Sequence, residues 1–236
     1  MIAISGLTKR FGDNTVFDGL SLSFPAGTTC LTGPSGSGKT TLARILAGLE
    51  DAESGTISGL AGRVVYLFQE PRLLPWKTAL DNVVLATPRA DAQQCEAAAP
   101  ADFAGRSPRR SGRRTERSPE RSSERRDALK AEAADLLTAL GLSPADNTKL
   151  PPELSGGMQQ RVSLCRAALH CRALKRAGEP VSAVILDEPL KGLDPATREQ
   201  AVKFIKSELA PASEHLIIIT HQEQDVNDFG GTAVSL

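Results

Sequence analysis

The sequence predicts an α/β fold with a mostly parallel central sheet. Short apolar segments typical of strands alternate along the chain with segments whose apolar residues recur at helical spacing, and this alternation favours a parallel sheet. The segments 63–68, 181–187 and 215–220 are nearly continuous apolar runs, as expected for buried strands. The 236 residues suffice for one such domain, or for one domain with a small subdomain.

The N-terminal part of the chain is expected to form three strands and one helix. Residues 2–7 alternate weakly between apolar and polar side chains and indicate an edge strand, and residues 17–24 alternate more regularly. Residues 27–33 are rich in β-forming side chains and stop at a glycine-rich loop. The helix that follows has apolar residues at helical spacing, namely Leu42, Ile45, Leu46 and Leu49.

A short helix at 78–86 precedes a change of composition. Residues 106–126 contain nine arginines and three glutamates, and most of the rest is serine and proline. Such low-complexity composition predicts disorder, within an insertion at about 88–126. Order is expected to resume with a helix that begins at Asp127 and ends at Gly141.

The C-terminal part of the chain continues the alternation of helices and strands. Ser155 and Asp194 are residues of the kind that cap helix N-termini, and Pro195 suits the first position of a helix. The expected elements are a helix at 155–176, a strand at 181–187, a helix at 195–209, and strands at 215–220 and 232–236.

The composition excludes several classes of protein. The formal net charge is zero, so the chain as a whole gives no indication of a nucleic-acid partner. No apolar run approaches the roughly 20 residues that cross a bilayer, and the N-terminus does not read as a signal peptide. The cysteines form no C-x-x-C pair, which favours reduced and mostly buried thiols of a cytosolic protein. They are Cys30, Cys95, Cys165 and Cys171.

The glycine-rich loop GPSGSGKT carries the clearest chemical signal. It fits the phosphate-binding pattern G-x-x-x-x-G-K-[ST] and lies between a predicted strand and a predicted helix. Its glycines let the backbone curl so that N–H groups point at phosphate oxygens. Lys39 supplies a charge for the β- and γ-phosphates, and the Thr40 hydroxyl can ligate Mg²⁺. The predicted nucleotide-binding residues here are Gly33, Pro34, Ser35, Gly36, Ser37, Gly38, Lys39, Thr40 and Thr41.

Two acidic residues end the apolar strand in the segment AVILDEP. Asp187, at the strand tip, is expected to hold Mg²⁺ through water. Glu188, one residue further on, is expected to polarise an attacking water as a general base. The alternative is an ordinary turn at the end of a strand, with both acidic side chains in solvent. The presence of the glycine-rich loop in the same chain makes this alternative much less favoured.

A second anion site is indicated at the start of the helix predicted at 155–176. Ser155, Gly156 and Gly157 lie at a helix N-terminus, whose free N–H groups attract negative charge. The alternative for these residues is a plain capping turn. The segment LSGGMQQR at 154–161 resembles the signature sequence of the ABC-type ATPases, and the resemblance covers nearly the whole chain.

The remaining motifs of that family follow in order along this sequence. Gln69 resembles the Q-loop glutamine, GLD at 192–194 the D-loop, and His221 the switch histidine. Phe11 occupies the place of the aromatic residue that stacks on adenine. The resemblance therefore implies ATP and Mg²⁺ as cofactors. It implies catalytic roles for Glu188, His221, Gln69 and Lys39, nucleotide contacts from Phe11, Ser155, Gly156, Gly157 and Asp194, and metal contacts from Thr40, Gln69 and Asp187.

The family resemblance also implies how two chains share the nucleotide. ABC ATPase domains work as head-to-tail pairs, in which ATP lies between the glycine-rich loop of one copy and the Ser155–Gly157 helix start of the other. Two helix N-termini can meet the charge of one γ-phosphate from both sides. A second ATPase subunit, most simply another copy of this chain, is therefore expected.

The same resemblance implies the domain organisation. The chain is expected to be a single P-loop NTPase domain over 1–236. Residues 1–69 and 178–236 are expected to form a RecA-like core with an N-terminal antiparallel β subdomain. Residues 70–177 are expected to form a helical signature subdomain that contains the insertion.

The segment EPRLLPWKTALDNV at 70–83 is similar to the corresponding stretch of nitrate, sulfonate and taurine importers of bacteria. In the family this region receives a membrane subunit, which would make Trp76, Leu73 and Leu74 apolar contacts for a permease. Subdomain core is an equally good interpretation of Leu73 and Leu74. The resemblance thus implies a solute importer with integral membrane permease subunits and an extracytoplasmic solute-binding protein, the chain lying on the cytoplasmic face of the inner membrane.

Two alternative functions remain beside this interpretation, and the role of the insertion is a separate question. An ABC ATPase without a membrane partner could act on nucleic acid or ribosomes, although such proteins generally carry two ATPase domains or a coiled-coil insert. A P-loop kinase or GTPase has no use for the LSGG segment. The insertion is expected to be a tolerated surface loop, whereas its arginines allow contact with RNA or acidic lipid.

Overall fold

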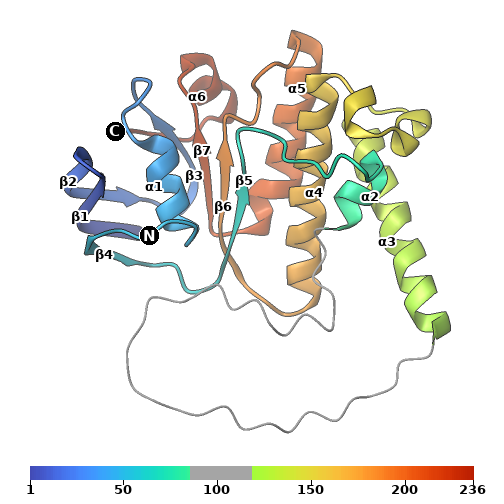
Figure 1. Ribbon diagram of the computed structural model, residues 1–236, viewed down its shortest axis with the longest axis horizontal. Coiled ribbons are helices and arrows are strands. Elements are labelled where there is room, and N and C mark those ends of the chain that lie inside the picture. Colours follow the sequence, from blue (N-terminus) through green and yellow to red (C-terminus); the bar gives the residue numbers. More distant parts are fainter. Residues whose placement is uncertain (86–118) are drawn as a thin grey trace, which may run out of the picture.

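The computed structural model describes residues 1–85 and 119–236, and the side chains of 119–122 are not part of that description (Figure 1). Three strands form an antiparallel sheet in the order β2-β1-β4. They are β1 (Ile2–Phe11), β2 (Asn14–Phe24) and β4 (Ser54–Ser58). The predicted antiparallel sheet is present, but β1 is its middle strand and not an edge strand, because β4 pairs with its other side.

The second sheet has five strands, and all of its pairs are parallel. The order is β5-β6-β7-β3-β8, which confirms the predicted mostly parallel α/β fold. The strands are β3 (Gly27–Thr32), β5 (Arg63–Leu67), β6 (Val181–Asp187), β7 (His215–Ile219) and β8 (Thr232–Ser235). Their carboxyl ends meet at one edge of the sheet, where ligands bind in open α/β folds.

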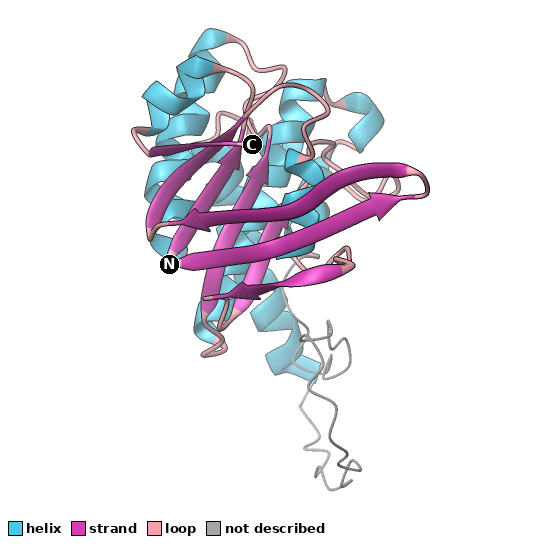
Figure 2. Ribbon diagram, turned by 90° about the vertical axis from the view of Figure 1, so that its left-hand side faces the viewer, coloured by secondary structure: helices cyan, strands magenta, loops and turns pink. Residues whose placement is uncertain are grey.

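The two faces of the parallel sheet carry different layers. One face packs against α1 (Lys39–Leu46) and the antiparallel sheet, which crosses the parallel strands in Figure 2. The other face packs against the helices, and Figure 1 shows these on the side away from α1. Strand side chains alternate between the two cores, so that Ile185 and Ile217 belong to the first and Leu186 and Ile218 to the second.

The helical side consists of α-helices and several short 3₁₀ and π-helical turns. Its main helices are α2 (Ala79–Val84), α3 (Pro119–Ala139), α4 (Gly156–Arg176) and α5 (Pro195–Phe204). Short 3₁₀ segments at Pro144–Thr148 and Pro151–Glu153 join α3 to α4. A π-helical turn at Ile205–Leu209 and a 3₁₀ turn at Ala210–Ala212 follow α5, and α6 (Glu223–Phe229) precedes β8.

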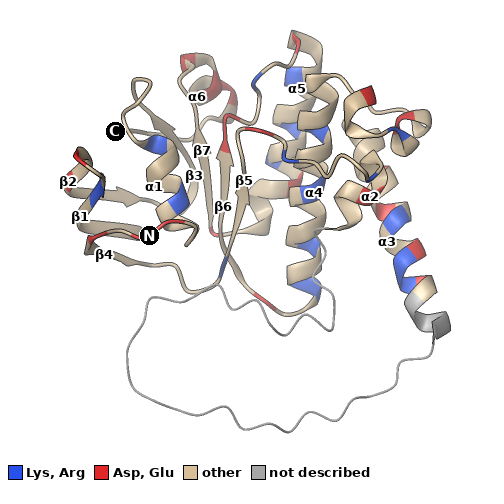
Figure 3. Ribbon diagram, in the orientation of Figure 1, with Lys and Arg blue, Asp and Glu red and all other residues tan. Residues whose placement is uncertain are grey.

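Ion pairs connect these helices where their charged positions face one another. Glu132 of α3 accepts from Arg172 and Arg176 of α4, and Arg172 also contacts Glu208 of the π-helical turn. Figure 3 shows the basic positions along α4 and the acidic positions where β6 ends. The contacts tie α3 and α4 to the end of α5. The predicted division into a core and a helical subdomain stays a prediction.

The expected disorder at 88–126 lies outside the described residues up to position 118. Over its last part the prediction is wrong, because α3 begins at Pro119 and not at Asp127. Proline suits the first helical position, and arginine and glutamate are strong helix formers. Their presence in a low-complexity tract therefore does not prevent a helix from extending into it.

The buried thiols of the described residues agree with the prediction from the sequence. Cys30, Cys165 and Cys171 are free and buried, and burial raises the pKa of the Cys30 thiol to about 11. Cys95 lies outside the described residues. Among the helices within 1–85 and 119–236, none has the length and apolar character needed to cross a membrane.

Candidate functional site

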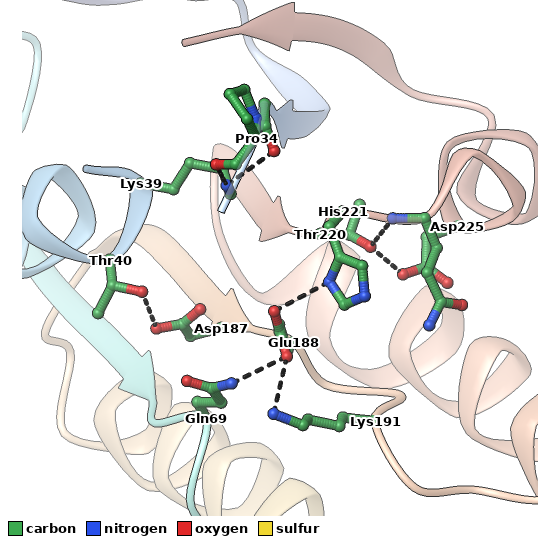
Figure 4. A network of polar contacts seen from close by, with 12 residues as sticks. Pro34, Lys39, Thr40, Gln69, Asp187, Glu188, Lys191, Thr220, His221 and Asp225 are labelled. Carbon is green, nitrogen blue, oxygen red and sulfur yellow. Dashed lines mark hydrogen bonds and ion pairs between the residues drawn. The ribbon is translucent and has the colours of Figure 1, made fainter. Parts of the chain in front are cut away.

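The glycine-rich loop lies at the carboxyl end of β3 and leads directly into α1. Gly38 caps α1 with a φ of 96°, in the left-handed region that favours glycine. A Cβ at Gly38 would lie 2.7 Å from side-chain atoms of Phe17 and Val16, so the antiparallel sheet presses against the loop. The Lys39 Nζ donates to the carbonyl oxygens of Gly33 (2.9 Å) and Pro34 (2.7 Å), which holds its charge inside the loop (Figure 4).

One polar atom of the loop has no partner in the described part of the chain. The Ser37 hydroxyl oxygen is buried there without a hydrogen bond. A buried polar group without a partner costs free energy. An oxygen atom of a ligand bound in the loop would remove that cost. Both this observation and the sequence of the loop therefore fit a bound phosphate group.

Asp187 is held by two hydroxyl groups at the tip of β6. Its Oδ2 accepts hydrogen bonds from Thr40 Oγ1 and Tyr66 OH, each 3.0 Å away. The carboxyl is buried, and burial raises its pKa, an effect that these hydrogen bonds oppose and the nearby charge of Glu188 reinforces. A cation beside this carboxylate would offset the cost of its burial.

The Thr40–Asp187 pair fits Mg²⁺ by the chemistry of its donors. Magnesium is bound in such sites by one or two carboxylates, a hydroxyl, waters and the phosphates of the substrate. Thr40 and Asp187 supply the hydroxyl and the carboxylate. No cluster of three or more metal-binding histidine, cysteine or acidic side chains occurs in the described residues.

Glu188 is the most densely contacted carboxylate of the site. Its Oε2 accepts from Gln69 Nε2 at 2.9 Å and lies 3.4 Å from Lys191 Nζ, and its Oε1 lies 3.0 Å from His221 Nδ1 (Figure 4). Burial would raise the pKa of this carboxyl, but the contacts with His221 and Lys191 outweigh burial and hold the pKa below its usual value. The carboxylate therefore stays ionised and able to accept a proton.

The backbone at Glu188 adopts a rare conformation. Its φ is 46°, in the left-handed region that a residue with a side chain seldom enters. Such conformations persist where the surroundings over-determine them, and they concentrate at functional sites. The Glu188 N–H donates to the Ile219 carbonyl at 3.0 Å, which fixes the turn beyond the sheet edge.

Sheet register explains why residues so distant in sequence meet here. Asp187 of β6 lies opposite Ile219 of β7, and Leu186 lies opposite Leu67 of β5. Gln69 and His221 each follow their strand by two residues, and both therefore reach Glu188. The structure thus brings together Lys39, Thr40, Asp187, Glu188, Gln69 and His221, all expected in the site.

Two residues that contact the site were missing from the sequence prediction. Lys191 reaches Glu188 from three residues further along the same turn. Tyr66 lies one residue before the end of β5 and reaches across to β6. The sequence places Tyr66 in an apolar run, where a phenol is interpreted as core, and only the sheet order shows that β5 and β6 are neighbours.

The predicted second anion site lies on the other face of the sheet. Ser155 caps α4 and its Oγ accepts from the Met158 N–H at 3.2 Å, as predicted. Gly156 and Gly157 line a cleft of about 470 Å³ together with Gln69, Lys191 and Asp194. Among the described residues that line this cleft, none belongs to the glycine-rich loop. Within one chain, therefore, the structure does not bring Ser155 and the loop into one site.

Phe11 and the segment at 70–83 that follows Gln69, here called the Q-loop segment, show exposed apolar surface. Phe11 is 46% exposed at the end of β1, and Lys9 Nζ lies 4.7 Å from the centre of its ring. Trp76 is 69% exposed and Leu74 is also exposed, whereas Leu73 packs against the helical core. Core packing is therefore the right interpretation for Leu73.

Comparison with known proteins gives one family. The family model described as "ABC transporter" matches residues 17–191. The chain is 32% identical over 245 residues to the Fe(3+) ions import ATP-binding protein FbpC 3 of Rhodococcus jostii, covering 98% of this chain and 58% of that protein. It is 35% identical over 219 residues to the aliphatic sulfonates import ATP-binding protein SsuB of Corynebacterium glutamicum, covering 92% and 72% respectively. The chain thus spans little more than half of the first relative's length.

Solved structures share the fold. The dimeric ATP-binding cassette MJ0796 in a post-hydrolysis state, bound to ADP and Pi, superposes with a TM-score of 0.70 at 20% identity, covering all of this chain and 94% of that one. A second dimeric structure of the same cassette gives a TM-score of 0.67 at 20% identity. At this level of identity the likeness supports the fold alone.

Proposed function

This chain belongs to the ABC transporter family, and we propose that it is the subunit that binds and hydrolyses ATP to drive a membrane transporter. The observation that carries the proposal is the meeting of the Thr40–Asp187 pair and the Gln69–Glu188–His221 contacts at one sheet edge. A phosphate-binding loop, a metal-binding pair and an ionised base are the parts that phosphoryl transfer to water requires.

The proposed roles follow from the contacts of each side chain. The loop N–H groups and Lys39 bind the phosphates. Lys39 donates to two carbonyl groups of the same loop, which keeps its positive charge next to the place where the phosphates bind. Glu188 accepts the proton of the attacking water. Gln69 and His221 contact different oxygens of Glu188 and so fix its orientation. Mg²⁺, when held by Thr40 and Asp187, with Gln69 as a further contact, would supply positive charge to the β- and γ-phosphates.

The two faces of the sheet support a two-chain mechanism. The loop opens α1 on one face, and Ser155 opens α4 on the other face. We propose that ATP bound to the loop of one copy meets Ser155, Gly156 and Gly157 of a second copy, and that Asp194 lies at the same interface. Phe11 stacks on the adenine from its exposed position at the end of β1.

The transporter is proposed to be a bacterial solute importer. The support comes from the names of the relatives, which are import ATP-binding proteins, and from the exposed side chains of Trp76 and Leu74 in the Q-loop segment. Integral membrane permease subunits cover this surface, and an extracytoplasmic solute-binding protein delivers the solute. The chain lies peripherally on the cytoplasmic face of the inner membrane. The names do not favour the alternative of an ABC ATPase that acts on nucleic acid.

Co-purification from membranes tests this proposal. The tagged chain, extracted with a mild detergent, is expected to bring down an integral membrane protein in stoichiometric amount and to hydrolyse ATP in a Mg²⁺-dependent reaction. Stoichiometric recovery of ribosomal particles or RNA with no membrane protein would contradict the transporter function, and absence of ATP hydrolysis would contradict the enzymatic one.

A further inference from the structure

A buried carboxylate lies just behind the proposed site but takes part in none of the contacts described for that site. Asp225, in α6, is only 4% exposed. It accepts a hydrogen bond from the buried Thr220 hydroxyl and contacts the guanidinium of Arg198 in α5. A buried charge is costly unless it is paired, and Asp225 is paired on both sides.

At its Thr220 end, this network contacts the residues that precede and follow His221 in the sequence. Thr220 Oγ1 accepts from the Gln222 N–H at 3.0 Å, so that one hydroxyl joins the residues on either side of His221 (Figure 4). The Thr220 N–H donates to the Leu31 carbonyl in β3 at 3.2 Å, which anchors the same turn to the sheet. His221 itself is exposed, and within the described residues the contact that its ring makes is with Glu188. Its position therefore depends on the turn that carries it.

The Arg198 end of the network leads to the GLD turn. Arg198 lies in the first turns of α5, and its N–H donates to the Asp194 carbonyl at 2.8 Å. Asp194 caps the same helix through its side chain, which accepts from the Thr197 N–H at 3.1 Å. The chain of contacts thus runs from Asp194 through Arg198 and Asp225 to Thr220, and so to the residue next to His221.

We propose that Asp225 is a positioning residue that sets the place of His221 against Glu188 and connects it to the Asp194 turn. The inference rests on the proposed function, because it needs His221 to act in ATP hydrolysis. The contacts of Asp225 are with Thr220 and Arg198, and neither of these residues belongs to the glycine-rich loop. Loss of Asp225 is therefore expected to lower the rate of the chemical step while ATP binding, which uses the loop at the far side of the site, stays the same.

Asp228 provides a matched control. It contacts the same Arg198 nitrogen, at 2.7 Å, but lies partly exposed and does not reach Thr220. In Asp225→Asn, kcat is expected to fall about 10-fold, on the order expected for the loss of one charged hydrogen-bond partner, with KM for ATP within about 2-fold. In Asp228→Asn both are expected to stay near wild type. Equal losses of kcat in the two variants would show that the network serves only to hold α5 against α6, and would overturn the proposal.

The Thr220 hydroxyl gives a second, independent pair of variants. Thr220→Val removes both hydrogen bonds and is expected to match Asp225→Asn, whereas Thr220→Ser keeps the hydroxyl and is expected to restore kcat. Nucleotide affinity measured without turnover shows that each variant is folded. If Thr220→Val hydrolyses ATP at the wild-type rate, the proposal is wrong.

His221→Ala separates the failure of this proposal from the failure of the proposed function. A large loss of kcat in His221→Ala with normal turnover in Asp225→Asn and Thr220→Val would overturn the positioning role alone. Normal turnover in His221→Ala would remove His221 from the reaction and with it the positioning role, while the proposed ATPase function would stand; that function would be overturned by a lack of ATP hydrolysis in the unsubstituted protein.

Discussion

Glu188 and His221 meet at 3.0 Å across the ends of two neighbouring strands, with the ring Nδ1 facing the carboxylate oxygen Oε1. Because an ionised carboxylate only accepts hydrogen bonds, the imidazole donates through Nδ1–H. The contact orients the proposed base and helps to keep its pKa low. It also makes the base dependent on a histidine that is itself more than half exposed.

The first prediction concerns the base. Glu188→Gln keeps the shape of the side chain but cannot accept a proton, so kcat is expected to fall about 10²- to 10⁴-fold while ATP still binds. Steady-state ATP hydrolysis and equilibrium binding of labelled ATP measure the two effects. Glu179→Gln, just before the other end of β6, is the control and is expected to hydrolyse ATP normally. Turnover in Glu188→Gln close to wild type would exclude Glu188 as the base.

The second prediction concerns acid stability at the junction of α3 and α4. Hydrogen bonds with Lys149 and Ser143 lower the pKa of the Asp146 carboxyl from 3.8 to about 2. A carboxyl whose pKa falls on folding stabilises the folded state above its unfolded pKa and loses this effect as the pH drops through the folded pKa. Asp146→Asn should therefore lower the Tm at pH 7 but leave it nearly unchanged near pH 2.

Thermal unfolding of the variant and the wild type across this pH range checks the sign. Asp135→Asn, an exposed position on α3, is the matched control and is expected to change the Tm little at either pH. A Tm difference for Asp146→Asn that grows toward acid pH would show that the carboxylate does not stabilise the fold.

The third prediction concerns the membrane partner. Trp76 is exposed beside the Q-loop, and removing it with Trp76→Ser should abolish recovery of the permease with the tagged chain while leaving ATP binding unchanged. Leu49→Ser is the control, because Leu49 is similarly apolar and exposed but follows α1 on the other face of the sheet. Undiminished permease recovery with Trp76→Ser would place the docking surface elsewhere.

The sheet and most of the site are predictable from the sequence because they rest on local signals. Apolar runs mark β6 and β7, and the glycine pattern marks the loop before Lys39. Helix capping by Ser155 is predictable because a serine side chain accepts a hydrogen bond from an N–H group of a residue that follows closely in the sequence. The structure confirms this prediction. Glu188 and His221 can be placed at one edge because parallel strands share their direction.

The rest depends on contacts between segments that are distant in the sequence. Tyr66 reaches Asp187 only because β5 lies next to β6, and strand order is not written in either strand. In the sequence, Asp225 is one of several acidic residues on a short helix. Only the structure shows that it contacts both Thr220 and Arg198. The sequence misplaces the start of α3 for a different reason, because low-complexity composition predicts disorder at residues whose helix propensity is high.

The central claim is that one ATP is closed between the loop of one chain and the Ser155 helix start of another. The direct test is ATP-driven dimer formation, measured by sedimentation in the Glu188→Gln background so that ATP persists. Ser155→Arg puts a bulky charge at an exposed helix start, and Ser207→Arg puts the same charge on an exposed serine just beyond α5.

With ATP, Glu188→Gln and Glu188→Gln with Ser207→Arg are expected to sediment as dimers. Glu188→Gln with Ser155→Arg is expected to bind ATP with unchanged affinity and to remain a monomer. ATP-dependent dimers of that last variant, as stable as those of the control, would contradict the claim that Ser155 belongs to a nucleotide site shared by two chains.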